Sequence, residues 1–144
     1  MKKIIGIFLL LIFFSCEKEK TEFIQSKAVG NLFLIKNPPK SDSLLKNIIK
    51  DFLIKNPQEY SPEKIGHLDF YNYTSNTKDF IEEERPGGYF REYLDYYPED
   101  ELAAFIISKC KNDTLKKVGR FHFYGLKGSN DGQKEIDTII YKCK

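Results

Sequence analysis

Residues 41–57 read SDSLLKNIIKDFLIKNP, and this stretch decides the fold. Its apolar residues recur at the three- and four-residue spacing that places them on one face of a helix. They are Leu44, Leu45, Ile48, Ile49, Phe52 and Leu53. Ser41 supplies an N-cap hydroxyl, and Asn56-Pro57 ends the pattern. The stretch therefore predicts an amphipathic helix with one face that must pack against other apolar elements.

Short β-prone segments lie on both sides of this helix. They are Asn31–Lys36, His67–Tyr73, Leu102–Cys110, Leu115–Tyr124 and Ile136–Cys143. Turn-forming residues at Asn112-Asp113 and in the loop Gly125–Gly132 separate the last three segments, which predicts an antiparallel C-terminal three-stranded meander. We expect an α+β fold in which one main helix packs on a curved antiparallel sheet of four to five strands. Cystatin-like and NTF2-like domains share this outline by analogy, but an outline does not fix function.

The first sixteen residues have the pattern of an export signal. Lys2 and Lys3 precede an uncharged run, Ile4–Phe14, that is too short to span a bilayer as a helix but matches a signal-peptide apolar region. The run ends at Phe13-Phe14-Ser15-Cys16, which resembles the lipobox of bacterial lipoproteins, although Phe13 and the bulky Phe14 depart from the usual residues. The resemblance implies that residues 1–15 are removed and that Cys16 is acylated. Simple secretion with a free Cys16 is the alternative.

The residues after the cysteine are polar and lack an apolar pattern, so they predict a flexible tether. We expect a signal peptide at 1–15, the lipidated cysteine and tether at 16–27, and one globular domain at 28–144. Over residues 1–22 the chain resembles small, uncharacterised lipoproteins of the Bacteroidota. The resemblance implies a membrane anchor through Cys16 in the cell envelope, with the outer membrane preferred over the inner membrane, since multiple acyl chains hold a protein stably at a bilayer.

Charge limits the classes of partner. The full chain has 23 basic and 21 acidic residues, and removing Lys2 and Lys3 with the signal leaves 21 of each. A neutral mature protein is a poor candidate for binding nucleic acid. The charge is nevertheless uneven, because residues 79–101 carry nine acids against two arginines, whereas residues 102–144 carry nine bases against four acids. This asymmetry is the strongest surface signal in the sequence.

Aromatic residues are concentrated within the acidic segment. Tyrosine is amphipathic and enriched at binding hot spots, so the segment predicts a surface for a basic protein or peptide. Its expected contact residues are Glu82, Glu83, Tyr89, Phe90, Tyr93, Asp95, Tyr96 and Tyr97. The other interpretation, which the helical spacing of the tyrosines favours, is that these rings cover one face of the sheet. The first reading favours a protein-binding module, such as an immunity-type inhibitor or an assembly accessory.

Two cysteines remain in the predicted domain. Cys110 and Cys143 invite a disulfide in an oxidising compartment. In the predicted meander they flank one middle strand at about 9.5 Å, beyond the roughly 7 Å that a disulfide tolerates. Both a bonded pair and two thiols remain open. Neither cysteine has zinc-ligand spacing with His67 or His122, so we expect no metal and no cofactor.

Two other functions remain as alternatives to protein binding. One is a small-ligand site in a cleft between the helix and the sheet, lined by Tyr71 and Tyr73. The other, less favoured, is an envelope hydrolase. The densest carboxylate run is residues 82–84, whose neighbouring side chains diverge on a helix, and no serine has the Gly-x-Ser-x-Gly context of a nucleophile. We therefore expect that the protein is not an enzyme.

Overall fold

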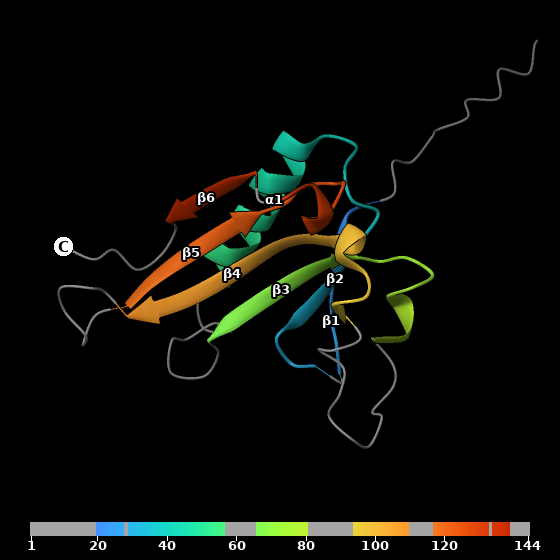
Figure 1. Ribbon diagram of the computed structural model, residues 1–144, viewed down its shortest axis with the longest axis horizontal. Helices are drawn as coiled ribbons and strands as arrows, with labels where there is room; N and C mark the ends of the chain where they lie inside the picture. Colours follow the sequence, from blue (N-terminus) through green and yellow to red (C-terminus); the bar gives the residue numbers. More distant parts are fainter. Residues whose placement is uncertain are drawn as a thin grey trace, which may run out of the picture.

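The computed structural model describes residues 20–27, 29–56, 66–80, 94–109, 117–132 and 134–138. Within these ranges the chain forms an α-helix, six strands and three 3-10 helices (Figure 1). The strands are β1 (Glu22–Gln25), β2 (Leu32–Lys36), β3 (His67–Asn72), β4 (Glu101–Lys109), β5 (Lys117–Phe123) and β6 (Glu135–Thr138). The helices are α1 (Asp42–Lys55), η1 (Lys78–Phe80), η2 (Pro98–Asp100) and η3 (Ser129–Asp131). The α+β class predicted from the sequence is confirmed.

The sheet departs from the prediction in strand number and in direction. Among the described residues it has six strands in the order β1-β2-β3-β4-β5-β6, not four to five, and it is mixed rather than antiparallel. The pair β2 and β3 is parallel, with Phe33 opposite Phe70, while the other neighbours are antiparallel. The reason is the connection: α1 lies between these two strands in the chain, and a helical crossover returns the chain to run in the same direction. The predicted C-terminal meander, β4-β5-β6, is confirmed.

The extra strand lies where a flexible tether was predicted. Glu22–Gln25 form β1 and pair with β2, so the expectation of a tether over residues 16–27 is wrong for this part. The ring of Phe23 stacks on Phe52 of α1, with centroids 4.1 Å apart. This contact buries apolar surface of β1 against the helix. The polar residues on both sides of Phe23 give no apolar pattern, so the sequence did not predict the strand. Residues 16–19 lie outside the described part of the chain.

The helix begins and ends where its caps predict. The Ser41 hydroxyl accepts from the backbone of Leu44, and both the backbone and the side-chain amide of Asn56 donate to the carbonyl of Phe52. The fully buried positions are Leu45, Ile49 and Leu53. Leu44 is 51% exposed, so the apolar face is narrower than the sequence suggested.

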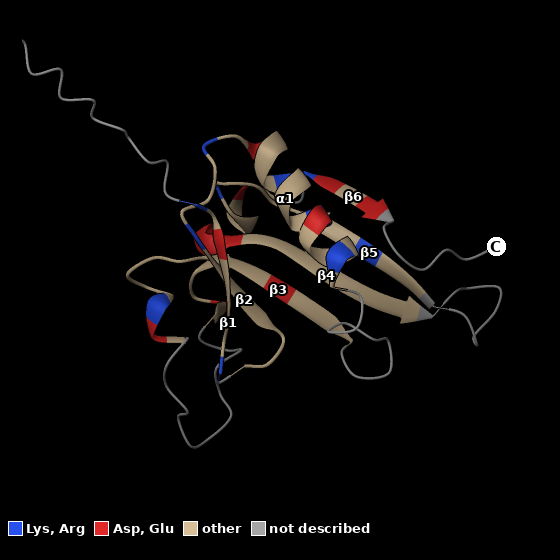
Figure 2. Cartoon of the chain, turned by 180° about the vertical axis from the view of Figure 1, so that it is seen from behind, with Lys and Arg blue, Asp and Glu red and all other residues tan. Residues whose placement is uncertain are grey.

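The main core lies between α1 and one face of the sheet. Figures 1 and 2 view the molecule from opposite sides, and in both views α1 lies against one face of the sheet. The core residues are Phe33, Ile35, Leu45, Ile49, Leu53, Leu68, Phe70, Leu102, Ala103, Phe105, Phe121 and Phe123. The helix crosses the sheet, because Phe52 contacts β1 while Lys46 and Lys50 reach β6.

A second, smaller core covers part of the opposite sheet face. Its members are Leu32, Leu34, Tyr71, Phe80 and Leu94. Strand β2 is therefore apolar on both faces, as expected for a central strand that is covered from both sides. On β3, Leu68 and Phe70 belong to the main core and Tyr71 to the second core, as expected for the alternating side chains of a strand.

Candidate functional site

Only part of the predicted partner surface can be placed. Asp95, Tyr96 and Tyr97 lie in the described range 94–109, just before η2. Glu82, Glu83, Tyr89, Phe90 and Tyr93 lie outside the described residues, as do Cys16, Cys110 and Cys143. The acylation of Cys16 and the disulfide therefore stay predictions.

The three placed residues divide between core and surface. Leu94 is buried in the second core, and Tyr97 packs against that core. Tyr96 is 73% exposed, and Asp95 beside it is also exposed. Core packing is therefore confirmed for Tyr97, whereas Tyr96 faces outward and a partner surface there stays a prediction. We call Asp95, Tyr96 and the exposed Glu99 the acidic rim.

A part-buried hydrogen bond links η2, next to the acidic rim, to the turn after β3. The carboxylate of Asp100 in η2 accepts a hydrogen bond of 2.9 Å from the Thr74 hydroxyl. Burial raises the pKa of Asp100 above its ordinary value, although the bond from Thr74 acts in the opposite direction. Gly128 lies so close to η2 that a Cβ there would be 2.3 Å from the Pro98 carbonyl oxygen. The rim is therefore held from two sides.

A polar group that sequence reasoning did not single out lies on the face opposite α1. Tyr71 of β3 is directly opposite Glu101 of β4, and Asp69 lies two residues before Tyr71 on the same strand. The backbone N–H of Tyr124, just after β5, donates to the Leu102 carbonyl and so places Tyr124 beside the start of β4. We call Asp69, Tyr71, Glu101 and Tyr124 the tyrosine–carboxylate group. Its four members come from three regions of the chain that only the folded sheet brings together.

The electrostatics of this group keep both phenols protonated. Burial raises the pKa of Tyr71 well above its ordinary value, and the nearby carboxylates of Glu101 and Asp69 raise it further. Burial, followed by the same two carboxylates, raises the pKa of Tyr124 to about 12. At neutral pH both phenols therefore keep their protons, and their hydroxyls can both donate and accept hydrogen bonds.

The two histidines lie on separate strands of the sheet. His67 Nε2 lies 3.1 Å from a carboxylate oxygen of Asp69 and 2.7 Å from the side-chain nitrogen of Asn31. His122 belongs to β5, two strands from β3, and faces Ala104 of β4. Over the residues that the structure describes, no group of three histidine, cysteine, aspartate or glutamate side chains could hold a metal ion.

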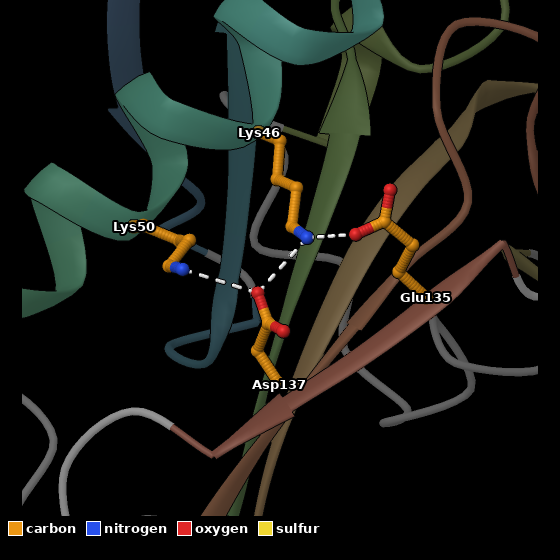
Figure 3. A network of polar contacts seen from close by, with 4 residues as sticks. All are labelled: Lys46, Lys50, Glu135 and Asp137. Atoms are coloured by element: carbon orange, nitrogen blue, oxygen red, sulfur yellow. Dashed lines mark hydrogen bonds and ion pairs between the residues drawn. The ribbon is translucent and has the colours of Figure 1, made fainter.

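A second polar region lies between α1 and β6. Figure 3 shows Lys46 and Lys50 extending from the helix to Glu135 and Asp137 of the edge strand. Lys46 contacts both carboxylates, and Lys50 lies 3.1 Å from Asp137. An open groove of about 470 Å³ runs beside this network. Its lining comprises Asp42, Ser43, Lys46, Asn47, Lys50, Phe123, Lys134 and Glu135.

Tyr71, which was expected to line a small-ligand cleft between the helix and the sheet, does not lie under α1. Tyr71 lies in the second core, on the sheet face opposite α1, so it cannot line a cleft beneath that helix. Tyr73 is 36% exposed and lies under the Lys36 ammonium group, 6.0 Å from its ring centroid. The space under α1 is filled instead by packed rings, among them Phe33, Phe52 and Phe70.

Comparison with known proteins adds no functional assignment. Among the described residues, no helix is both long and apolar enough to cross a membrane. No family model matches the chain, and neither a curated protein nor a solved structure matches it.

Proposed function

We propose that the protein is a lipid-anchored lipoprotein of the bacterial cell envelope that acts by binding a basic protein or peptide, with no catalytic step of its own. The support for the anchor is the sequence before the domain: two lysines, an apolar run and Cys16 in a lipobox-like context. Acyl chains on Cys16 would hold the neutral domain at a bilayer. We propose that the acyl chains insert in the outer membrane rather than the inner membrane.

The acidic rim carries the proposal for the partner. Tyr96 is a large ring with 73% of its surface exposed, and it lies beside the exposed carboxylate of Asp95. Leu94 and Tyr97, which flank this pair in the chain, pack in or against the second core. These contacts hold the backbone of Asp95 and Tyr96 in place. Rigid tyrosines flanked by charge favour binding, because they bury a large area and lose little conformational entropy.

The outline of the fold suits a binding role. A helix across one face of a curved sheet, as in cystatin-like and NTF2-like domains, leaves parts of the other face for a partner. An acidic surface would also speed association with a basic partner and make that rate sensitive to salt. An immunity-type inhibitor or an assembly accessory would both use such a surface.

A crosslinking experiment in intact cells tests this proposal. Tyr96 is replaced by photoreactive benzoylphenylalanine in the full chain, and adducts are identified by mass spectrometry. We expect a discrete adduct with an envelope or secreted protein that carries a basic contact surface. Introducing Glu83→Lys with Asp95→Lys should reduce its yield by on the order of tenfold without unfolding the domain.

The matched control is Asp51→Lys, which reverses an exposed charge on α1, away from the acidic rim. This variant should leave the adduct unchanged. Crosslinking that is equally strong in the Glu83→Lys/Asp95→Lys protein would reject the acidic segment as the binding surface.

A further inference from the structure

The open groove between α1 and β6 is lined mainly by polar side chains. Its volume of about 470 Å³ lies within the range of about 300–1,000 Å³ that small-ligand sites occupy. Phe123 is an apolar member of the lining, but only 2% of its surface is exposed, so it offers a ligand little apolar contact. Most ligand pockets are lined by apolar and aromatic side chains. This groove therefore suits a polar ligand rather than an apolar one.

The charged groups of the groove and of the network beside it are paired with one another. Three carboxylates and three ammonium groups take part: Asp42, Glu135, Asp137, Lys46, Lys50 and Lys134. Figure 3 shows the contacts between the helix and the edge strand. The nitrogen–oxygen distance is 2.7 Å for Lys134 and Asp42 and 2.9 Å for Lys46 and Asp137. Because these charges balance, a free cation or anion would meet a like charge beside every opposite one.

The backbone holds one of these ion pairs in place. The Leu126 N–H donates to Asp42 Oδ1 over 2.8 Å, and the Lys134 ammonium group lies 2.7 Å from Asp42 Oδ2. Gly125 contacts the same pair, because a Cβ at that position would be 2.6 Å from Lys134 Nζ. Its φ of +86° is a conformation that other residues rarely adopt. A donor and an acceptor are thus fixed side by side at the start of α1 before a ligand binds, which lowers the entropic cost of binding.

We propose that this groove binds a short neutral oligosaccharide. A sugar hydroxyl donates one hydrogen bond and accepts others, so it bridges an ammonium donor and a neighbouring carboxylate acceptor. An ammonium group has three N–H donors and a carboxylate accepts about four bonds, so one ion pair does not use up either group. Hydrogen bonds to charged groups are roughly twice as strong as those between neutral groups. A neutral chain of hydroxyls therefore matches the groove without disrupting its ion pairs.

Two exposed side chains of α1 extend this polar surface outward. Ser43 and Asn47 lie about one helical turn apart, and both line the groove. The Ser43 hydroxyl and the Asn47 amide each donate and accept hydrogen bonds, so they suit hydroxyls of a sugar ring that extends beyond the ion pairs. This inference goes beyond the proposed protein partner, because the groove and the acidic rim share no residue.

Titration with trisaccharides tests the site. Maltotriose and the N-acetylglucosamine trimer are added separately to the purified protein in micelles of lauryldimethylamine oxide, a detergent without a sugar head group. Backbone amide signals are followed by NMR. We expect at least one trisaccharide to cause saturable shifts, with millimolar affinity, centred on Ser43, Asn47 and Glu135. Inorganic phosphate and spermidine, the anionic and cationic probes, should cause no saturable shift of these signals. No saturable shift with either trisaccharide, or tighter binding of a charged probe, would overturn the proposal.

Asn47→Ala removes one expected hydrogen-bonding group without altering the ion pairs. Alanine has the higher helix propensity, so this exposed substitution should not unfold α1. It should weaken trisaccharide binding about three- to tenfold, as expected for the loss of one hydrogen bond. Asn130→Ala is the matched control, because Asn130 is exposed in η3 and is not among the residues that line the groove. This control should bind as the parent protein does. Equal affinities of the two variants would overturn the assignment of the ligand to this groove.

Discussion

The ammonium nitrogen of Lys46 lies 2.9 Å from a carboxylate oxygen of Asp137, which joins the middle of α1 to the edge strand β6. The same nitrogen contacts Glu135. The Lys46 side chain is largely buried, while the two acids are partly exposed. The hydrogen bonds that Lys46 donates to Glu135 and to Asp137 raise the pKa of Lys46 above its ordinary value, although burial acts in the opposite direction. This network is the polar counterpart of the apolar contacts that dock the helix on the sheet.

Replacing Lys46 with methionine should lower the free energy of unfolding by about 1 kcal/mol, because two ion pairs are lost while the apolar stem is kept. Urea denaturation monitored by circular dichroism measures the change. Lys55→Met is the matched control, since the Lys55–Asp51 pair is highly exposed and its atoms are 4.0 Å apart. Its effect should be close to zero. Equal losses in the two variants would show that the network to β6 contributes nothing specific.

Stability should fall as the solution becomes acidic. The hydrogen bonds from Lys134 and the Leu126 backbone lower the pKa of Asp42, and those from Lys46 and Lys50 lower the pKa of Asp137. A carboxyl whose folded pKa is lowered stabilises the fold above its unfolded pKa of about 3.9, and this contribution is lost as pH falls toward the folded pKa.

The measurement is urea unfolding at a series of pH values from about 6 to 2.5. The double variant Asp42→Asn/Asp137→Asn should be less stable at neutral pH and should show a shallower decline on acidification. A decline as steep as that of the parent protein would mean that other groups control the acid transition.

Asp100 should show the opposite pH dependence. Burial raises the pKa of Asp100, so the folded state favours the protonated form of this carboxyl. Its contribution to the free energy of unfolding is therefore full below the unfolded pKa and is lost as pH rises from the unfolded pKa through the folded pKa. Asp100→Asn removes the charge but retains an acceptor for Thr74, so it should raise the melting temperature at pH 7. Asp100→Ala should lower the free energy of unfolding by about 1 kcal/mol, because the Thr74 hydroxyl loses its partner. A loss of stability in the asparagine variant at pH 7 would contradict this account.

Gly128 should be the least replaceable glycine of the described loop. Its φ of 76° is unfavourable for other residues, and an added Cβ would collide with the backbone of Pro98 and Glu99. Gly128→Ala should therefore unfold more readily than Gly132→Ala by about 1–3 kcal/mol. Gly132 has a similar φ of 80° but open space around a Cβ, so it controls for backbone strain alone. Equal melting temperatures of the two variants would show that the close contact of Gly128 with η2 does not limit the substitution.

The elements that depend on local sequence were predicted well. The helix follows from its apolar spacing and its caps, which act within a few residues. The order and antiparallel pairing of the meander follow from its turn residues. The exact register does not: Lys109 faces Lys117 and Arg120 faces Thr138, each one residue away from hairpins centred on residues 112–113 and 129–130.

The remaining features depend on contacts between distant residues. Strand β1 forms because Phe23 stacks on Phe52 of α1 and pairs with Ile35 of β2. The four residues of β1 alone have no pattern that predicts these contacts. The parallel pairing of β2 with β3 is set by the path of α1. The tyrosine–carboxylate group was missed because Tyr71 and Tyr124 are brought together by the sheet, although the alternation of Asp69 and Tyr71 on one strand was visible.

Mass spectrometry of the protein extracted from bacterial envelopes tests the central claim most directly. We predict a chain that lacks residues 1–15 and carries acyl groups on Cys16, released from the membrane by detergent but not by salt. A full-length chain in the soluble cytosolic fraction, with an unmodified Cys16 thiol, would contradict the account.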